Sequence, residues 1–497
     1  MSELIKDCVF IVGSSNVFRA MYAQLQSSGQ WEQIEAALYV MAAVGRNILP
    51  EEDTVVPAVL KQVLALEPGL HIMVRLTATK LVGELCEWIE KHPETLQATL
   101  NYLLQVNWSR ERQFYILCYF QCLHEPPLAS EAAAALTSIC GQCRNHMAEH
   151  FMGLLQILEQ VDSFKLKPEA ANGLIKGVVM IISIMTNSEQ LAEAVEKVCL
   201  IQVTPLNNIM NTSASMAEPP KITKHSATDP VLYLDRLSAV FRHIQPSGCG
   251  RGGGPSSTPH PCRPTIESLW PVLSRCLDLY QKDVRVTERT CRTIRFAIRC
   301  IGVQSSSLLS PLVTQMVALY ASQHNSCYLY LGSILVDEFA CEAGCIPGLL
   351  SMLQAFIHPT YSILSVNGGL VAHPDTVDDF FRLNARFLQR APVPYLQTEF
   401  IKSILECALL SVTLEHRDAN ASVMKFFYDL LHSGRTRNDH ADFATRSNLI
   451  KTLHTEYGEK LVDSLIKAAV TTLPSYTYHD LADVVHECLV HDRVSVV

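Results

Sequence analysis

Five arginines recur at spacings of three and four residues between positions 284 and 301 of the sequence. They are Arg285, Arg289, Arg292, Arg295 and Arg299. On a helix they fall within an arc of roughly 120°. The opposite side of the same helix carries Val286, Ile294, Ala297, Ile298 and Ile301. Guanidinium groups form paired hydrogen bonds with phosphates or carboxylates, so an evenly spaced row suits a partner with repeated anions such as phosphorylated serines. The spacing therefore predicts a helix with one buried face and one anion-binding face.

A second interpretation of these arginines is structural. Like charges three or four residues apart disfavour a helix by about 0.2–0.5 kcal/mol per pair, which Glu288 on the same side relieves in part. The arginines could form a solvated outer face, or pair with acids on a neighbouring helical repeat. Phe296, which lies within the arginine face, favours an interface.

Two other groups of residues have the composition of a metal or nucleotide site, but not its context. The first has zinc-ligand types and consists of Cys140, Cys143, His146 and His150. These fall on about three turns of one predicted helix, which cannot wrap four ligands tetrahedrally around an ion. The second is the GxGxxG pattern of Gly248, Gly250 and Gly253, with kinase-like triplets at 416–418 and 442–444. That pattern follows a helix, and no strand with the kinase lysine comes after it.

The remaining serines, cysteines and histidines form no nucleophile elbow, HExxH or Walker loop. We therefore predict no catalytic residue, no metal and no cofactor, and a protein that is not an enzyme. An enzyme built around the glycine-rich loop remains the weakest alternative.

The elements that hold these residues are expected to be helices. Apolar residues recur at helical spacing, and prolines or glycines punctuate the chain every fifteen to twenty-five residues or so, for example at Pro126, Pro168, Pro311 and Pro374. Such short helices bury their apolar stripes against sequential neighbours in pairs of roughly 40–47 residues. The fold class is therefore all-α: a HEAT/ARM-type α-solenoid superhelix of antiparallel helix pairs. Separate helix bundles are the alternative, and these would need linkers.

Only two stretches resemble linkers, at residues 211–226 and 246–264. A single predicted helix from Asp229 to about Ile244 lies between them, so they are expected to be flexible inter-helix loops of one solenoid covering 1–497.

Residues 106–121 are dense in aromatic residues and have no clear helical stripe. We expect an inserted segment there, with an ordinary extension of the preceding helix as the alternative.

Composition limits the partners and the compartment. Hydrophobic residues make up 48% of the chain and the formal net charge is −9, which favours an extensive core and disfavours wholesale binding to nucleic acid or an anionic membrane. Seventeen cysteines scattered singly are typical of a reducing compartment, so we expect the cytoplasm or nucleus. No charged residue occurs from Cys300 to Val336, but polar residues and Pro311 interrupt this stretch, so it is expected to be a buried helical pair rather than a membrane span.

Long runs of the sequence resemble the transportin-SR branch of the importin-β family. The similarity extends along nearly the whole chain. The runs are at 12–14, 30–32, 144–151, 311–316, 329–338, 373–379 and 416–426. The match corresponds to the carboxy-terminal half of that family, and the segment 106–121 interrupts it.

The resemblance implies a nuclear import receptor that shuttles between cytoplasm and nucleus. Its implied partners are serine/arginine-rich (RS-domain) splicing factors in phosphorylated form, Ran-GTP and nucleoporins. In that family an arginine-rich helix reads the phosphorylated RS segment, and by position it is the helix with Arg285, Arg289, Arg292, Arg295 and Arg299. The family's amino-terminal arch, which supplies the main Ran-binding surface, has no counterpart here, so Ran-driven release is not expected of this chain alone. A HEAT-repeat scaffold without transport activity is the competing hypothesis.

Overall fold

The computed structural model describes residues 2–27, 29–67, 69–104, 123, 125–215, 222–246 and 259–494. No strand occurs among those residues, and helices dominate them. The chain divides into two compact units. The first comprises Met1–Arg251 and Thr258–Thr265, and the second comprises Gly252–Ser257 and Ile266–Val497.

Helices of the first unit stack in two rows. In one row each helix packs against the next: α3 (Trp31–Val44), α5 (Ile72–Glu84), α9 (Pro126–Gln142), α12 (Pro168–Ile182) and α14 (Pro230–His243). The other row contains α2 (Ser14–Ser27), α4 (Val55–Leu64) and α7 (Leu96–Leu104), and later α11 (Phe151–Glu159) and α13 (Ser188–Ala214). Shorter elements are α1 (Ser2–Val12), α6 (Cys86–Lys91), α10 (Arg144–Met147), and the 3-10 turns η1 (Gly45–Asn47), η2 (Pro93–Thr95), η3 (Ala148–His150) and η4 (Val161–Phe164).

Small residues allow the helices of the first row to approach closely. A Cβ atom on Gly83 of α5 would lie 2.7 Å from the Cα of Ala135 of α9, so only glycine fits there. Leu136 and Ile139 of α9 are buried in the same region. The apolar stripes predicted from the sequence thus pack against sequential neighbours.

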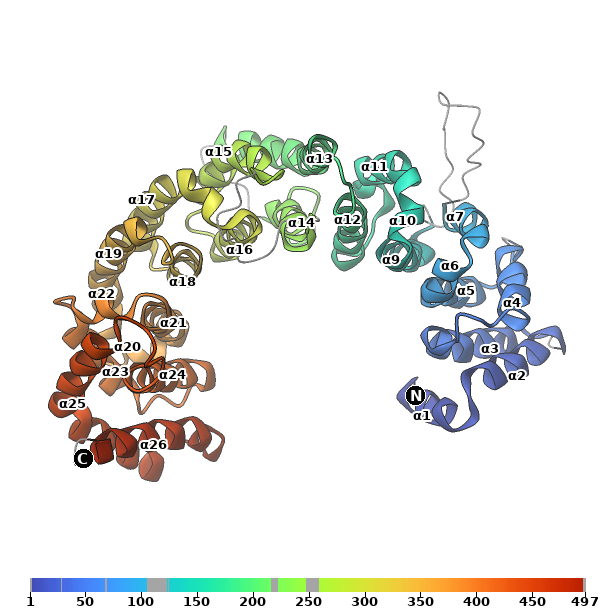
Figure 1. Ribbon diagram of the computed structural model, residues 1–497. Coiled ribbons are helices and arrows are strands. Elements are labelled where there is room, and N and C mark those ends of the chain that lie inside the picture. Colours follow the sequence, from blue (N-terminus) through green and yellow to red (C-terminus); the bar gives the residue numbers. More distant parts are fainter. Residues whose placement is uncertain are drawn as a thin grey trace. The chain divides into compact units, whose positions relative to one another are not determined.

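The second unit also has two rows. We call α16 (Val284–Ile301), α18 (Cys327–Phe339), α21 (Pro374–Arg390), α24 (Arg417–Ser433) and α26 (Tyr478–Val494) the inner row, since Figure 1 shows these helices on the concave side of this unit. The other row contains α17 (Ser306–Gln323), α19 (Ile346–Leu364), α22 (Pro392–Leu396), α23 (Ile401–Ser411) and α25 (Phe443–Thr471). Shorter elements are α20 (Gly369–Ala372), η5 (Gly302–Ser305), η6 (Ala343–Cys345) and η7 (Ser475–Thr477).

Aromatic side chains join the helices of the inner row. Phe381 of α21 packs against Phe426 of α24 with ring centroids 5.5 Å apart, and both side chains are fully buried. Phe380 and Phe427 extend this cluster at centroid distances of 5.4 and 5.6 Å from Phe381 and Phe426. Buried aromatic pairs of this kind fix the spacing of neighbouring helices.

Most of the predicted helix boundaries at proline are confirmed. Pro126, Pro168 and Pro374 each lie in the first turn of a helix, where a missing N–H does no harm. Pro311 is an exception, because it lies inside α17 and does not end a helix. Burial of Leu312 and Met316 on the same helix opposes the loss of about 3 kcal/mol that an internal proline causes.

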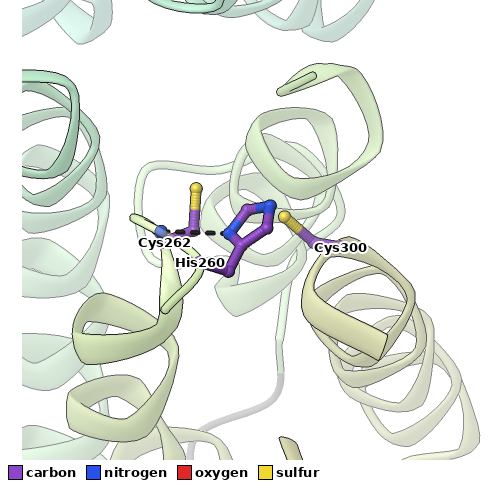
Figure 2. Close-up of side chains that lie close together, drawn as sticks. All are labelled: His260, Cys262 and Cys300. Carbon is purple, nitrogen blue, oxygen red and sulfur yellow. Dashed lines mark hydrogen bonds between the residues drawn. The ribbon is translucent and has the colours of Figure 1, made fainter. Parts of the chain in front are cut away.

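The two predicted inter-helix loops are shorter in the structure than in the sequence analysis. α13 extends to Ala214, so residues 211–214 are helical, and residues 263 and 264 already belong to α15 (Arg263–Leu279). In the turn before α15, the backbone amide of Cys262 donates a hydrogen bond to Nδ1 of His260 at 3.2 Å (Figure 2). The segment 106–121 and the glycine pattern at 248–253 lie outside the described residues.

One helical run, Val284–Gln323, has the length and apolar composition of a membrane-crossing helix. It is not one continuous α-helix, because α16 ends at Ile301, Gly302 has a φ of +54°, and α17 begins at Ser306 after η5. α17 packs against α18, as expected of a helical pair.

Candidate functional site: the arginine face of α16

The predicted arginine helix is α16, with the predicted bounds Val284 and Ile301. Oδ1 of Asp283 accepts a hydrogen bond from the amide of Val286 at 3.0 Å, which caps the first turn. Gly302, in a conformation that disfavours other residues, ends the helix. The five apolar residues predicted for the buried face are all buried, at exposed fractions of 5% or less.

The five predicted arginines lie on the other face of α16. Arg285, Arg289, Arg292 and Arg295 are half-buried, and Arg299 is exposed. α16 itself lies at one end of the inner row, on the concave side of the second unit (Figure 1). From Arg285 to Arg299 the row is about 21 Å long at 1.5 Å per residue.

Aromatic rings support the middle of the row. The guanidinium carbon of Arg295 lies 4.4 Å from the ring centroid of Phe296 and 5.4 Å from that of Tyr330 on α18. Nη1 of Arg295 donates to the hydroxyl of Tyr330 at 2.8 Å, whereas its Nε is buried without a hydrogen-bond partner. Arg292 lies over the same Phe296 ring at 5.9 Å. The contacts of Arg295 hold its guanidinium in place without neutralising its charge.

The carboxy-terminal end of the row has acid partners on the neighbouring helix. Arg299 lies 3.4 Å from Oδ2 of Asp337 and 3.6 Å from Oε1 of Glu338, both on α18. The structural interpretation of the arginines therefore holds for Arg299. Burial raises the pKa of Glu338, against the lowering effect of Arg299 beside it.

Two arginines that the sequence analysis did not select meet the same carboxylate. Arg386 and Arg390 of α21 approach Asp337 with their Nε atoms at 3.8 and 2.9 Å. Asp337 thus contacts three guanidiniums from α16 and α21. The four-residue spacing of Arg382, Arg386 and Arg390 was a signal in the sequence, because it places these arginines on one face of a helix, as the spacing of the α16 arginines does.

The other residue groups weighed in the sequence analysis have structural contacts. The Cys143 thiol donates to the backbone carbonyl of Cys86 at 3.6 Å, and burial raises its pKa to about 12, which disfavours a thiolate ligand. His416 accepts a hydrogen bond from the amide of Ala419 and caps α24. Asp442 pairs with Arg446 at 3.0 Å.

A cavity of about 840 Å³ lies between α25 and α26, away from the arginine face. Its lining includes Lys451, His454, Glu459 and His491. An extended partner with repeated charges needs a long surface rather than such a cavity, so the arginine face remains the candidate site.

Comparison with known proteins agrees with the fold. Two family models match the chain: the Transportin-3/Importin-13 third TPR domain at residues 53–157, and the fourth TPR domain at 260–364, which contains the whole of α16. Transportin MOS14 of Arabidopsis thaliana is 23% identical over 493 residues, covering 96% of this chain and 47% of the relative. Human Importin-13 is 21% identical over 446 residues, covering 84% and 42%.

These matches support a karyopherin-β family member. The solved structure titled "Importin13 cytosolic state" has the same fold, with a TM-score of 0.76 and 15% identity over 99% of this chain and 53% of that chain. The predicted all-α solenoid of HEAT type is therefore confirmed. The karyopherin-β relatives are nuclear transport receptors, a family without enzymatic activity.

The chain spans about half the length of the relatives it matches: 47% of Transportin MOS14, 42% of human Importin-13 and 50% of the mRNA transport regulator MTR10 of Saccharomyces cerevisiae. The two matched domain models fall one in each unit, apart from residues 260–265.

Proposed function

We propose that the chain is part of a nuclear import receptor of the transportin-SR type, which carries phosphorylated RS-domain splicing factors into the nucleus. Its partners would include Ran-GTP and nucleoporins, and it would shuttle between cytoplasm and nucleus. The cargo-binding residues are Arg285, Arg289, Arg292, Arg295 and Arg299 on α16.

The observation that carries the proposal is the retained charge of Arg295 on α16. Arg295 is held by a phenol and an aromatic ring rather than by a carboxylate. An extended peptide advances about 3.3–3.6 Å per residue, so a row about 21 Å long matches about three Arg-Ser dipeptides. Several charge-assisted hydrogen bonds could then form with consecutive phosphates.

The test is the affinity of a synthetic peptide with three phosphorylated Arg-Ser repeats for the double variant Arg289→Ala, Arg292→Ala. We expect binding to weaken by at least about tenfold, since two charge-assisted contacts are lost. The unphosphorylated peptide should bind parent and variant equally weakly. Equal affinity of parent and variant for the phosphorylated peptide would contradict the proposal.

A HEAT-repeat scaffold without transport activity is the second candidate function. It is favoured by the fold alone, because stacked helix pairs serve many binding proteins. Affinity purification separates the two: splicing factors that elute on addition of Ran-GTP indicate transport, whereas a stable complex that lacks them indicates a scaffold.

A further inference from the structure

The arginines on α21 continue the positive surface of α16 across the inner row. Arg390 and Arg386 share Asp337 with Arg299, so the end of the α16 row is directly connected to α21. Arg386 also donates to Oε1 of Gln389 at 2.7 Å, and Nε2 of Gln389 donates to Oδ2 of Asp429 on α24 at 2.6 Å. These contacts fix the α21 arginines in position.

The cations of this cluster are nearer to solvent than the acid that holds them. The side chains of Arg299, Arg386 and Arg390 are 38%, 40% and 52% exposed, whereas that of Asp337 is 11% exposed. A guanidinium has five N–H donors, and the contacts above use one or two on each arginine. Unused donors therefore remain on each of these partly exposed groups.

Charge also remains on the cluster. Three guanidiniums face two carboxyl groups, those of Asp337 and Glu338, so the sum is positive even when both acids are ionised. A partner that brings an anion to this point restores neutrality.

We infer that Arg386 and Arg390, together with Arg299, form a second phosphate-binding position for the phosphorylated segment that α16 binds. The inference rests on the proposed function, because it assigns the same partner to a second helix. Arg299 at the carboxy-terminal end of the α16 row contacts the same carboxylate as Arg386 and Arg390, so the second position adjoins that end, and a phosphorylated segment longer than the row continues onto it.

A phosphorylated peptide fits this surface better than a nucleic acid. Acids alternate with the cations along the inner row: Asp337 beside Arg390, Asp378 at 2.9 Å from Arg382, and Asp429 at 2.6 Å from Lys425. A segment whose phosphates alternate with arginines can satisfy both signs, whereas a uniform polyanion meets repulsion at each acid.

The experiment compares two peptides, with three and with eight phosphorylated Arg-Ser repeats, on the full chain at one salt concentration. The variant Arg386→Gln, Arg390→Gln should bind the eight-repeat peptide about tenfold more weakly than the parent and the three-repeat peptide within about twofold. The control Lys402→Gln, Lys460→Gln removes the same charge from exposed positions on α23 and α25, and it should leave both affinities unchanged.

The outcomes separate this inference from the proposed function. If the α21 variant binds the eight-repeat peptide like the parent, or loses both peptides equally, the second position does not exist, whatever α16 does. If Arg289→Ala, Arg292→Ala leaves the three-repeat affinity unchanged, the proposed function fails independently. A single-stranded RNA 20-mer that binds as tightly as the eight-repeat peptide and shows the same loss would overturn the peptide as partner.

Equal thermal unfolding of all variants excludes misfolding as the cause of weaker binding. The variant Arg386→Lys, Arg390→Lys should recover part of the affinity, because lysine retains the positive charge but lacks the forked donors of arginine.

Discussion

Arg236 and Arg75 of the first unit each pair with one acid, whereas three arginines of the second unit share one acid. Arg236 of α14 lies 2.7 Å from Asp162, and its side chain is only 7% exposed. Arg75 of α5 forms two hydrogen bonds with Glu125, at 2.9 and 2.6 Å. In each case a guanidinium and a carboxylate neutralise each other and connect two segments of the unit.

In the second unit one carboxylate, that of Asp337, meets guanidiniums of Arg299, Arg386 and Arg390. Arg295 on the same surface has a phenol as its hydrogen-bond partner. The two arrangements differ in the net charge that they leave. A one-to-one pair is complete and contributes to stability, whereas a shared acid positions several cations and leaves positive charge for a partner.

The largest effect predicted by this comparison is on the stability of the first unit. Arg236→Ala should lower the free energy of unfolding by about 2–3 kcal/mol, because it removes a buried side chain and leaves Oε1 of the fully buried Gln202 without its donor at 3.3 Å. Urea denaturation followed by circular dichroism measures the loss, and phosphopeptide affinity should not change. The control Arg46→Ala breaks an exposed pair with Glu84 and should have an effect below about 1 kcal/mol. Equal losses in both variants would mean that burial does not distinguish the pairs.

The sequence was sufficient to predict the helices but not all of their ends. α14 and α16 have the predicted limits because a capping aspartate precedes each of them, at Asp229 and Asp283. α17 continues through Pro311, and α13 continues beyond Asn211. Burial of Leu312 on α17 and of Met210 on α13 outweighs the local sequence features that predicted a helix end at these residues.

For the candidate site, the sequence predicted the face of α16 but not its surroundings. Helical period alone places the five arginines opposite Ile294 and Ile298, and the burial of these residues agrees. The partners Tyr330 and Asp337 are distant in sequence and come close only through packing of α18 against α16. The convergence of Arg386 and Arg390 on Asp337 needs a third helix as well, so spacing along the chain could not reveal it.

A second prediction concerns Asp379, an acid of the inner row that is not part of the Asp337 cluster. Burial raises the pKa of Asp379 to about 7, which the hydrogen bond from Ser326 only partly opposes. The folded state therefore binds this proton more tightly than the unfolded state, whose aspartate has a pKa near 4. Stability should fall as pH rises from about 4 to about 7 and then level off, by an amount on the order of 1 kcal/mol.

Urea denaturation of the parent at pH 5 and pH 8 measures this decline. Asp379→Asn removes the titrating group and should flatten the profile over that window. If the parent's stability rises between those pH values by an amount that Asp379→Asn abolishes, the carboxylate is stabilised rather than destabilised by its surroundings, and it would resemble the paired acids of the first unit.

The smallest expected effect, and the one that tests the comparison most directly, is that of Asp337→Asn on binding. The variant retains the shape of the side chain but removes the negative charge that competes with a phosphate for Arg299, Arg386 and Arg390. Affinity for the eight-repeat phosphopeptide should increase about threefold, with a stability loss of about 1 kcal/mol from weaker contacts across three helices. Glu456→Gln is the matched control, since it makes the same charge change in an exposed pair with Lys402 at 2.8 Å and should alter neither the affinity nor the stability.

A weaker rather than tighter complex of Asp337→Asn would mean that the acid's positioning of the guanidiniums outweighs its competition with the phosphate. A shared acid would then act like the one-to-one pairs of the first unit, with a mainly structural role.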